Sequence, residues 1–321
     1  MSERVRLGVV GLGVMGTRVL GIALDHPAYD VVLAADPDLA ARDRVAFEHR
    51  GLRLAATAEE VLDADLDAVY VATPPATHAG IVLPALERRI AVLCEKPLAV
   101  DLAEGEAMAA AAATSGVATA VNFALSDRAT VRELERALAA GEAGEVRSVQ
   151  IRLAFPRWPR DFQGDARWLA RREQGGFLRE VFSHFAYLTD RLVGELTPVE
   201  QQVRFGHGPD AAEVEASAVF AAGGVPVRVW AESQSAVPET YRWELHGTHR
   251  SWALTDWTEL SWSDGDVWHR QEVPGEQGSD RHRLSAFAAA VRGEPTAHLA
   301  DFAAALRVQK VVEGWLHTRL A

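Results

Sequence analysis

The sequence predicts an α/β protein of two domains: a doubly wound parallel sheet in residues 1–121, then an α+β domain with a largely antiparallel, open sheet in residues 122–321. Helix and strand patterns alternate in the first part, whereas strand patterns dominate the second. All nine tryptophans lie between Trp158 and Trp315, so the two parts also differ in composition. A chain of 321 residues is long enough to build two cores.

The first domain is expected to alternate buried strands with helices. The expected strands are Arg4–Val10, Val31–Ala35, Asp67–Ala72, Ile90–Cys94 and Ala118–Asn122. The expected helices are Val14–Leu24, Ala58–Ala64, Ala79–Arg89 and Ala103–Ser115, with another around Arg42. Strands that are joined through helices pair in parallel, and the ligands of such sheets lie at the carboxyl ends of the strands.

The second domain is expected to open with a helix at Ala129–Ala140, which ends at Gly141. Apolar or alternating runs separated by Gly, Pro and Asp then predict strands. These strands are Val146–Phe155, Thr197–Phe205, Val214–Phe220, Val225–Ser233, Thr240–His246 and Ser251–Ser261. Helices are expected at Gly176–Val193, Arg281–Arg292 and Leu299–Arg319.

Charge and composition argue against several classes of partner and location. The formal net charge of -12 disfavours general binding to nucleic acid or to anionic membranes, because both require a basic face. The chain lacks a signal-peptide pattern, and no apolar run reaches the roughly 18 to 20 residues of a membrane-spanning helix. We therefore expect a cytoplasmic enzyme. The single cysteine, Cys94, cannot form an intramolecular disulfide and is expected in the core.

Gly11, Gly13 and Gly16 form a G-x-G-x-x-G motif between the first expected strand and the first expected helix. Bare backbone amides at a helix N-terminus bind a pyrophosphate group. We therefore expect a Rossmann domain whose dinucleotide contacts these glycines and also Val14 and Met15. The alternative is a glycine-rich turn without a ligand, and the strand, the helix and the acid that follows count against it.

Asp36 ends the second expected strand, where its carboxylate would accept hydrogen bonds from an adenosine ribose diol. The same carboxylate would repel a 2′-phosphate, so NAD is favoured over NADP. Arg42 lies in the next helix and could weaken that preference, which leaves NADP possible.

The loop from Ala72 to His78 follows a strand at the same edge of the sheet. We expect Thr73, Pro74 and His78 to line the nicotinamide ribose. The alternative is a proline-rich turn in which His78 caps the following helix.

Lys96 lies between Glu95 and Pro97, directly after another strand. Only two of the 33 basic residues are lysines, Lys96 and Lys310, so a lysine here suggests that the amine itself is needed. A lysine can exchange a proton with a substrate oxygen, whereas an arginine is too weak an acid to do so. We expect Glu95 and Lys96 at the cofactor and Lys96 at the reacting centre; the alternative is a surface lysine.

The glycine motif with its acid, the stretch TPPATH at residues 73–78 and the triplet EKP at residues 95–97 together resemble the Gfo/Idh/MocA family, named for glucose-fructose oxidoreductase and inositol dehydrogenase. The resemblance continues through Asn122 and through Gly141–Val149, the entry into the second domain. It implies an NAD(P)-dependent oxidoreductase in which Asn122 contacts cofactor and substrate. Similar proteins are often dimers or tetramers.

The family's second-domain signature is a glycine cluster followed by L-x-D-x-x-x-H on a helix. Gly175–His184 is similar to it, with Glu180 in place of the usual Asp and Phe182 in place of a common Gly. The resemblance implies that His184 and Glu180 belong to the active site. Being four residues apart, they would share one face of a helix, and the carboxylate could orient the imidazole. The alternative is a His that fills the core.

The connection Phe155–Arg172, before that helix, is rich in arginine and tryptophan. We expect Arg157 and Trp168 to contact substrate, as a guanidinium fork for an anionic group and an aromatic face for a sugar. The alternative is a solvated loop that faces another subunit. His246 and His249 are spaced H-x-x-H without partnering acids, so no metal site is assigned.

Together with the residues, the resemblance implies hydride transfer between NAD(P) and a hydroxyl-bearing carbon of a sugar, polyol or related cyclic compound. Either Lys96 or His184 would exchange the hydroxyl proton, and the sequence leaves both open as the base. An imine or carbonyl reductase is the second hypothesis, and a non-catalytic nucleotide-sensing protein is the third. The expected partners are a small-molecule substrate and a second copy or copies of the chain, as a homodimer or homotetramer through the C-terminal sheet.

Overall fold

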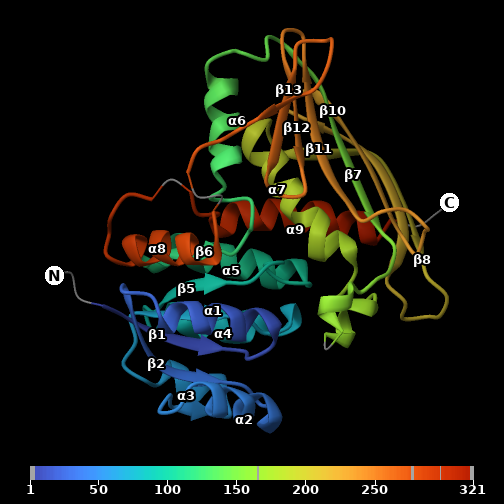
Figure 1. Ribbon diagram of the computed structural model, residues 1–321. Coiled ribbons are helices and arrows are strands. Elements are labelled where there is room, and N and C mark those ends of the chain that lie inside the picture. The colour runs from blue at the N-terminus through green and yellow to red at the C-terminus, as the bar shows by residue number, and fades with distance from the viewer. Residues whose placement is uncertain (1–3, 165, 276–277, 297, 319–321) are drawn as a thin grey trace. The chain divides into compact units, whose positions relative to one another are not determined.

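The computed structural model describes the chain except for residues 1–3, 165, 276–277, 297 and 319–321 (Figure 1). It divides into two compact units. The first unit contains Met1–Phe123 and Ser279–Leu306, and the second contains Ala124–Gly278 and Arg307–Ala321. Among the described residues, the main strands form a six-stranded sheet in the first unit and an eight-stranded sheet in the second.

The segment Ser279–Leu306 differs from the expected division, which assigned it to the second domain. Its helix α8 (Asp280–Val291) buries Leu284, Phe287 and Ala288 in the core of the first unit. The hydroxyl of Tyr29 also donates to the carbonyl of Leu284 at 2.6 Å. An apolar helix face belongs to the core that covers it, and the sequence alone does not say which core that is.

The six-stranded sheet has the order β3-β2-β1-β4-β5-β6, and its paired strands are parallel, so the predicted doubly wound sheet is confirmed. Its strands are β1 (Val5–Val10), β2 (Tyr29–Ala35), β3 (Leu54–Ala55), β4 (Ala68–Val71), β5 (Ala91–Cys94) and β6 (Thr119–Val121). Its helices in chain order are α1 (Val14–Leu24), α2 (Leu39–Glu48), α3 (Ala58–Leu62), α4 (His78–Glu87), α5 (Leu102–Ser115) and α8. The two-residue strand β3 was not expected, because a pair of residues carries no periodicity.

Start and stop signals explain where these helices begin and end. Asp101 caps α5 by accepting from the amide of Glu104 at 3.0 Å, and Gly116 ends it with a left-handed φ of 71°. Thr57 and Glu60 form a reciprocal capping box at the start of α3. Helix α1 instead begins at Val14, and the N-cap residue before it, Gly13, has no side chain to cap it. Its first amides are therefore available to a ligand.

The eight-stranded sheet has the order β14-β13-β12-β11-β7-β10-β9-β8. Its pairs are antiparallel except β7 with β10, so a largely antiparallel sheet is confirmed. The strands are β7 (Val146–Phe155), β8 (Leu196–Phe205), β9 (Glu213–Ala222), β10 (Val225–Ser233), β11 (Thr240–Gly247), β12 (Ser251–Thr255), β13 (Glu259–Ser263) and β14 (His269–Gln271). Short helical turns η2 (Asp161–Gln163) and η3 (Arg167–Ala170) follow β7.

The expected single strand Ser251–Ser261 is instead a hairpin of β12 and β13. The chain turns at Asp256 and Trp257, which both have positive φ, 45° and 69°. Such turns usually carry Asn or Gly, so the pair Asp-Trp gave no turn signal. Strand β14 was also not expected.

Helices cover one face of this sheet in the second unit, where α6 (Ala129–Ala139) and α7 (Ser183–Leu192) lie beside the strands in Figure 1. The buried Trp243 of β11 donates from its indole to the hydroxyl of Thr189 on α7 at 3.0 Å. Along β9 buried and partly exposed residues alternate, as expected for a sheet covered on one face. The other face of the sheet is exposed in the single chain.

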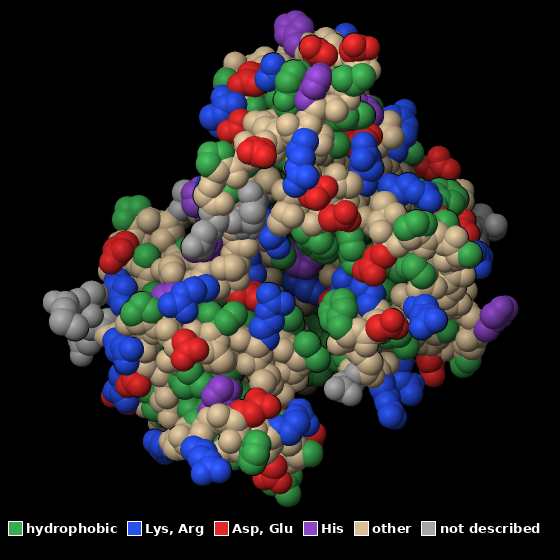
Figure 2. Space-filling model, viewed as in Figure 1, with side chains coloured by type: hydrophobic (Ala, Val, Ile, Leu, Met, Phe, Trp, Pro, Cys, Tyr) green, Lys and Arg blue, Asp and Glu red, His purple; other side chains and the backbone are tan. Residues whose placement is uncertain are grey.

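The remaining helix, α9 (Phe302–Leu316), is shorter than expected, and Arg319 of the expected helix lies outside the described residues. The boundary between the two units falls within α9. Acidic and basic side chains are interspersed over the face shown in Figure 2. Across the described ranges, none of the helices is both long enough and apolar enough to pass through a membrane.

Candidate active site

Two of the three glycines of the first turn are required by close backbone packing, and the third is not. A Cβ on Gly11, whose φ is +96°, would lie 2.5 Å from the carbonyl oxygen of Ala72, and one on Gly16 would lie 1.9 Å from that of Gly11. A Cβ on Gly13 would meet nothing within 4 Å. Gly11 and Gly16 are thus required by the protein's own packing, whereas the open space at Gly13 fits the approach of a pyrophosphate group. Val14 is exposed beside it and Met15 is partly exposed.

Asp36 lies at the carboxyl end of β2 and is held by backbone amides. Its Oδ2 accepts from the amide of Leu12 at 2.7 Å, and its Oδ1 accepts from that of Asp38 at 2.8 Å. The guanidinium of Arg42 donates to the Asp36 carbonyl at 2.6 Å, so a positive charge lies next to the carboxylate. This fixed carboxylate fits a ribose diol, with Arg42 close enough to affect the choice between NAD and NADP.

The loop after β4 is tied to the loop after β5 by His78. The side chain is buried, with Nε2 3.0 Å from the carbonyl of Thr73 and Nδ1 3.1 Å from the carbonyl of Leu98. Burial lowers the pKa of the imidazole, so the ring is neutral and donates to one carbonyl at a time. Thr73 is partly exposed and Pro74 is exposed. The accessible part of the loop is therefore Thr73 and Pro74, and His78 holds that loop in place.

Glu95 is buried at the end of β5 and accepts two hydrogen bonds on one oxygen. The Tyr70 hydroxyl donates to Oε1 at 2.5 Å and the Asn122 amide nitrogen donates at 2.6 Å. The backbone amide of Lys96 donates to Oε2 at 3.4 Å. Burial raises the pKa of Glu95. Lys96 itself is partly exposed, and its peptide bond to Pro97 is cis.

The glycine pair of the second unit has a steric cause in its surroundings. A Cβ on Gly175 would lie 2.4 Å from the carbonyl oxygen of Trp168, and one on Gly176, at φ +97°, would lie 2.1 Å from Oε2 of Glu213. The other oxygen of the Glu213 carboxyl accepts from the amide of Leu178 at 2.7 Å. Glu213, on β9, thus fixes the first turn of the helical segment that carries Glu180 and His184.

That segment is not one continuous α-helix as expected. Leu178–Phe182 is a π-helical turn, and α7 follows it. Arg179, in the π-turn, is buried and forms a bidentate ion pair with Glu313 of α9, with N–O distances of 2.6 and 2.7 Å. Its remaining donors reach the carbonyls of Arg172 and Gly175. The π-turn is thereby anchored on both sides, and such turns are frequent at functional sites.

Glu180 projects from the π-turn into a group that we call the Glu180 cluster, made of Arg160, Gln163, Glu180 and Tyr241. Gln163 donates to Glu180 Oε1 at 2.9 Å, and Arg160 pairs with the same oxygen at 3.3 Å. Arg160 also donates to the Tyr241 hydroxyl at 2.9 Å. Burial raises the pKa of Tyr241, so its hydroxyl stays protonated near neutral pH. The cluster presents a carboxylate and a guanidinium side by side, a pairing suited to hydroxyl groups.

His184 is almost fully buried in the first turn of α7. Its Nδ1 accepts from the backbone amide of Ala124 at 3.2 Å, which places the proton of the neutral ring on Nε2. The ring meets the indole of Trp257 edge to face, with centroids 5.3 Å apart. Trp257 also contacts Tyr241 at 5.1 Å between centroids. Trp257 therefore joins His184 to the Glu180 cluster.

Arg157 and Trp168, which were expected to contact substrate, are not members of the Glu180 cluster. Arg157 is 80% exposed and its guanidinium lies 3.7 Å from Asp161, while Arg160 is the arginine that reaches the cluster. Trp168 lies in η3, where its backbone carbonyl accepts from Arg171. His246 does have an acid partner, contrary to expectation, since Nε2 lies 3.1 Å from Glu244. Within the described ranges, no group of three or more His, Cys, Asp or Glu side chains is arranged to hold a metal ion.

Sequence reasoning missed several side chains that shape these sites, namely Tyr70, Arg160 as the interacting arginine, Gln163, Tyr241 and Trp257. It also missed Arg283, whose guanidinium donates to Oδ1 of Asn122. Arg160 and Gln163 lay within the stretch that was singled out, and only their individual roles were missed. Tyr70 and Tyr241 look like ordinary strand aromatics. No sequence signal marks Trp257 or Arg283, because their partners are distant in the chain.

Two models of one family match most of the chain. The model described as "Oxidoreductase family, NAD-binding Rossmann fold" matches residues 5–123, and the "GFO/IDH/MocA C-terminal domain" matches residues 131–253. The chain is 36% identical over 155 residues to inositol 2-dehydrogenase 4 of Saccharopolyspora erythraea, and the match covers 45% of this chain and 44% of that protein. It is 30% identical over 147 residues to the scyllo-inositol 2-dehydrogenase (NAD(+)) of Bacillus subtilis, and this match covers 45% of this chain and 43% of that protein. These matches span less than half the length of each relative.

Solved structures show the same fold over nearly the whole chain. An oxidoreductase from Thermotoga maritima superposes with a TM-score of 0.85 at 17% sequence identity, covering 98% of this chain and 96% of that one. The glycine turn, Asp36 and the loops after β4 and β5 lie at one edge of the parallel sheet, as a dinucleotide requires. The chain belongs to the Gfo/Idh/MocA family of oxidoreductases, and its first unit is that family's NAD-binding Rossmann domain.

Proposed function

We propose that this protein is an NAD-dependent dehydrogenase that oxidises a hydroxyl-bearing carbon of a cyclic polyol or sugar, reversibly. The observation that carries the proposal lies in the first unit, where Glu95 and Lys96 follow β5 at the same sheet edge as the dinucleotide turn. The inositol dehydrogenases among the relatives support a cyclic polyol as the first substrate class to test.

The residues divide the work between binding and proton transfer. Gly11, Gly13, Val14, Met15 and Gly16 would hold the pyrophosphate and Asp36 the adenosine ribose. Thr73, Pro74 and Asn122 would lie towards the nicotinamide end, with His78 and Glu95 holding their loops. The bound nicotinamide supplies the hydride-accepting carbon.

Proton exchange falls to Lys96 and His184. Because the Ala124 amide donates to Nδ1, the neutral imidazole carries its proton on Nε2, and under this proposal it would donate that proton to the substrate oxygen. Lys96 would take the hydroxyl proton during oxidation and return it during reduction. Glu180, with Arg160, would bind neighbouring hydroxyl groups, and Arg157 and Trp168 stay predictions as substrate contacts.

The test is a spectrophotometric assay of NAD reduction with a panel of inositols, hexoses and sugar acids. Lys96→Ala and His184→Ala are each expected to lower turnover by at least roughly 100-fold, as loss of an acid–base group does. Lys310→Ala is the matched control because Lys310 is the other lysine of the chain. If both variants keep near wild-type turnover on the true substrate while NADH binding is intact, the proposed roles are wrong.

The same assay separates the rival activities. NADH oxidation with imines or ketones, in the absence of sugar oxidation, would establish the reductase alternative. Any substrate-dependent hydride transfer would exclude a non-catalytic nucleotide sensor. The cytoplasmic location stays a prediction.

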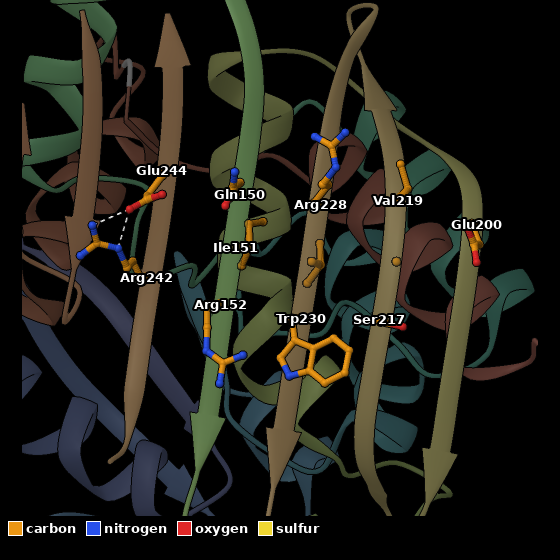
Figure 3. Close-up of a pocket in the computed structure, with 12 residues that line it drawn as sticks. Gln150, Ile151, Arg152, Glu200, Ser217, Val219, Arg228, Trp230, Arg242 and Glu244 are labelled. Atoms are coloured by element: carbon orange, nitrogen blue, oxygen red, sulfur yellow. Dashed lines mark hydrogen bonds and ion pairs between the residues drawn. The ribbon is translucent and has the colours of Figure 1, made fainter. Parts of the chain in front are cut away.

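We further propose that the exposed sheet face binds a second copy of the chain. A hollow of about 480 Å³ lies on this face, lined by apolar Trp230 and Val219 and by charged side chains of both signs (Figure 3). Trp230 lies on β10, which is an interior strand of the sheet, and its side chain is 42% exposed. Such exposure is unusual for a large aromatic residue on an interior strand. Mixed charges allow a self-complementary contact.

Sedimentation velocity tests this surface. Wild-type protein is expected as a dimer or tetramer, and Trp230→Glu as a smaller species, because a carboxylate would be buried without a partner. Phe47→Glu is the control, since Phe47 is 79% exposed on α2 of the first unit. A monomeric wild-type protein at micromolar concentration would refute the oligomer proposal.

A further inference from the structure

A chain of polar side chains, all buried except that of Arg18, crosses the first unit beneath Lys96. We call it the Glu95 network; its members are Arg18, Tyr70, Glu95, Asn122, Asp280 and Arg283. Arg283 donates from Nε to Asn122 Oδ1 at 2.5 Å, and Asn122 donates in turn to Glu95. Arg283 also pairs with Asp280, whose other oxygen lies 2.8 Å from Arg18 Nε on α1. The network thus runs from the dinucleotide-binding helix to the loop of Lys96.

Both polar groups of the Asn122 side-chain amide are hydrogen-bonded in this arrangement. Its NH₂ group faces the Glu95 carboxylate and its oxygen faces the Arg283 guanidinium. A flip of the amide would set the oxygen against the carboxylate and the NH₂ against the guanidinium, which are two unfavourable contacts. Arg283 therefore determines which group Asn122 presents to Glu95.

Stability alone does not explain the Glu95 network, because burying its charged groups costs free energy. Glu95, Asp280 and Arg283 are each at most 6% exposed, and taking charges out of water costs several kcal/mol per ion before pairing returns it. Well-packed apolar side chains would fill such a site at less cost. A network of buried polar groups joined by hydrogen bonds and ion pairs instead fixes a geometry.

The geometry that it fixes includes the main chain of Lys96. The Glu95 carboxylate accepts from the Lys96 amide on one oxygen, while Tyr70 and Asn122 hold the other. The groups that face this carboxylate are Tyr70 on β4, Cys94 on β5, Lys96, and Asp280 from α8. Two donors on Oε1 favour the ionised form of Glu95 against its burial.

We propose that Arg283 is a positioning residue for Lys96: through Asn122 it holds the Glu95 carboxyl group in place beneath the Lys96 backbone. The role of Lys96 in turnover rests on the proposed function, whereas its placement does not. Arg283 belongs to the segment Ser279–Leu306, which is part of the first unit although it follows most of the second unit in the chain. This segment therefore contributes to the placement of the Lys96 loop as well as to the core.

Selective amine labelling tests this without any substrate. The chain has two lysines, so trace acetylation followed by peptide mass spectrometry gives the reactivity of Lys96 with exposed Lys310 as internal reference. In Arg283→Met, Glu95 takes up a proton more readily, and the negative charge beside the amine is lost. The Lys96 labelling curve is then expected to shift to lower pH by at least half a unit relative to Lys310. Arg283→Lys is expected between Arg283→Met and wild type, since an ammonium lacks the fork that serves two partners.

Arg281→Met is the matched control, because Arg281 is exposed on the same helix and its loss changes the net charge equally. It is expected to leave the labelling curve unchanged. If folded Arg283→Met gives the wild-type curve, the proposal is overturned. Should that variant fail to fold by circular dichroism, a wild-type curve for Arg283→Lys overturns it equally.

Kinetics provide the second readout once a substrate is known. A positioning role predicts a fall in kcat of roughly 10- to 100-fold with the KM for NAD little changed. A protein that shows the labelling shift but no activity on any substrate would refute the proposed function and leave the role of Arg283 intact.

Discussion

The edge of the Trp257 indole meets the imidazole of His184, with ring centroids 5.3 Å apart and planes at 83°. Trp257 reaches this place from the turn of the β12–β13 hairpin, with a φ of 69°. A left-handed backbone is unfavourable for a bulky residue by roughly 1–2 kcal/mol. Strain kept at a residue that contacts a candidate acid–base group is a reason to test that residue for function.

Replacement of Trp257 is expected to separate backbone strain from ring contacts. Trp257→Gly should be more stable than Trp257→Ala by about 1 kcal/mol, because glycine adopts positive φ without a Cβ penalty. Thermal melting measures this as a difference of roughly 2–4 °C. Both variants should lose roughly tenfold in kcat/KM for the polyol, whereas Trp257→Phe should keep most of it. Trp268→Ala is the control, because Trp268 is an exposed tryptophan between β13 and β14. Equal stability of the Gly and Ala variants would argue against the strain.

Asp36→Ser is expected to lower the affinity for NADH and to raise the relative use of NADPH by roughly 10- to 100-fold. The serine removes the charge that repels a 2′-phosphate, and Arg42 remains beside it to attract one. Fluorescence titration with the two reduced cofactors measures the ratio. Asp38→Ser is the control, since Asp38 caps α2 and is exposed. A ratio that does not move for Asp36→Ser would remove Asp36 from the ribose site.

Glu213 is expected to make the second unit less stable as the pH rises. Burial raises the pKa of Glu213 above its unfolded value, so the folded state binds the proton more tightly. Its contribution to stability is therefore present at low pH and is lost as the pH rises through the folded-state pKa. Its Oε2 also has no hydrogen-bond partner among the described residues.

Glu213→Gln should consequently be more stable than wild type at pH 7.5, by about 1 kcal/mol or roughly 2–4 °C in melting temperature. The difference should shrink towards pH 4.5, where the wild-type carboxyl becomes protonated. Glu213→Ala should be destabilised at both pH values, because Leu178 loses its acceptor. Glu215→Gln, two residues along β9 and half-exposed, is the control. A Gln variant less stable than wild type at pH 7.5 would contradict the sign.

Substitutions of Arg179 and Glu313 are expected to have non-additive effects on the free energy of unfolding, because the two side chains form a buried ion pair. Arg179→Met or Glu313→Leu alone should cost about 3–5 kcal/mol, because each leaves a buried charge without its partner. The double variant Arg179→Met/Glu313→Leu should cost clearly less than the sum. Urea unfolding of the four proteins measures the coupling. Additive losses would mean that the pair does not act as a unit.

The sequence by itself determined the doubly wound parallel sheet of the first unit and which residues follow its strands at the carboxyl edge. Helix α1 was expected at Val14–Leu24 and is found there, because its glycine turn and apolar period are local signals. The glycines, Asp36, Glu95 and Lys96 were found by the same kind of signal, because each lies just after a strand and parallel strands end at one edge. The resemblance to the family extended this to His184 and Glu180.

Only the tertiary structure decided which distant residues act on these. Arg283 reaches Asn122 across 161 positions and Tyr241 reaches Arg160 across 81, separations at which no periodicity or turn preference operates. The π-turn at Leu178–Phe182 likewise follows from Glu213 on β9 and Glu313 on α9. Local patterns specify helices, strands and the turns between them. The orientation of a buried polar side chain depends instead on partners that folding brings together, because burial removes the water that would otherwise satisfy it.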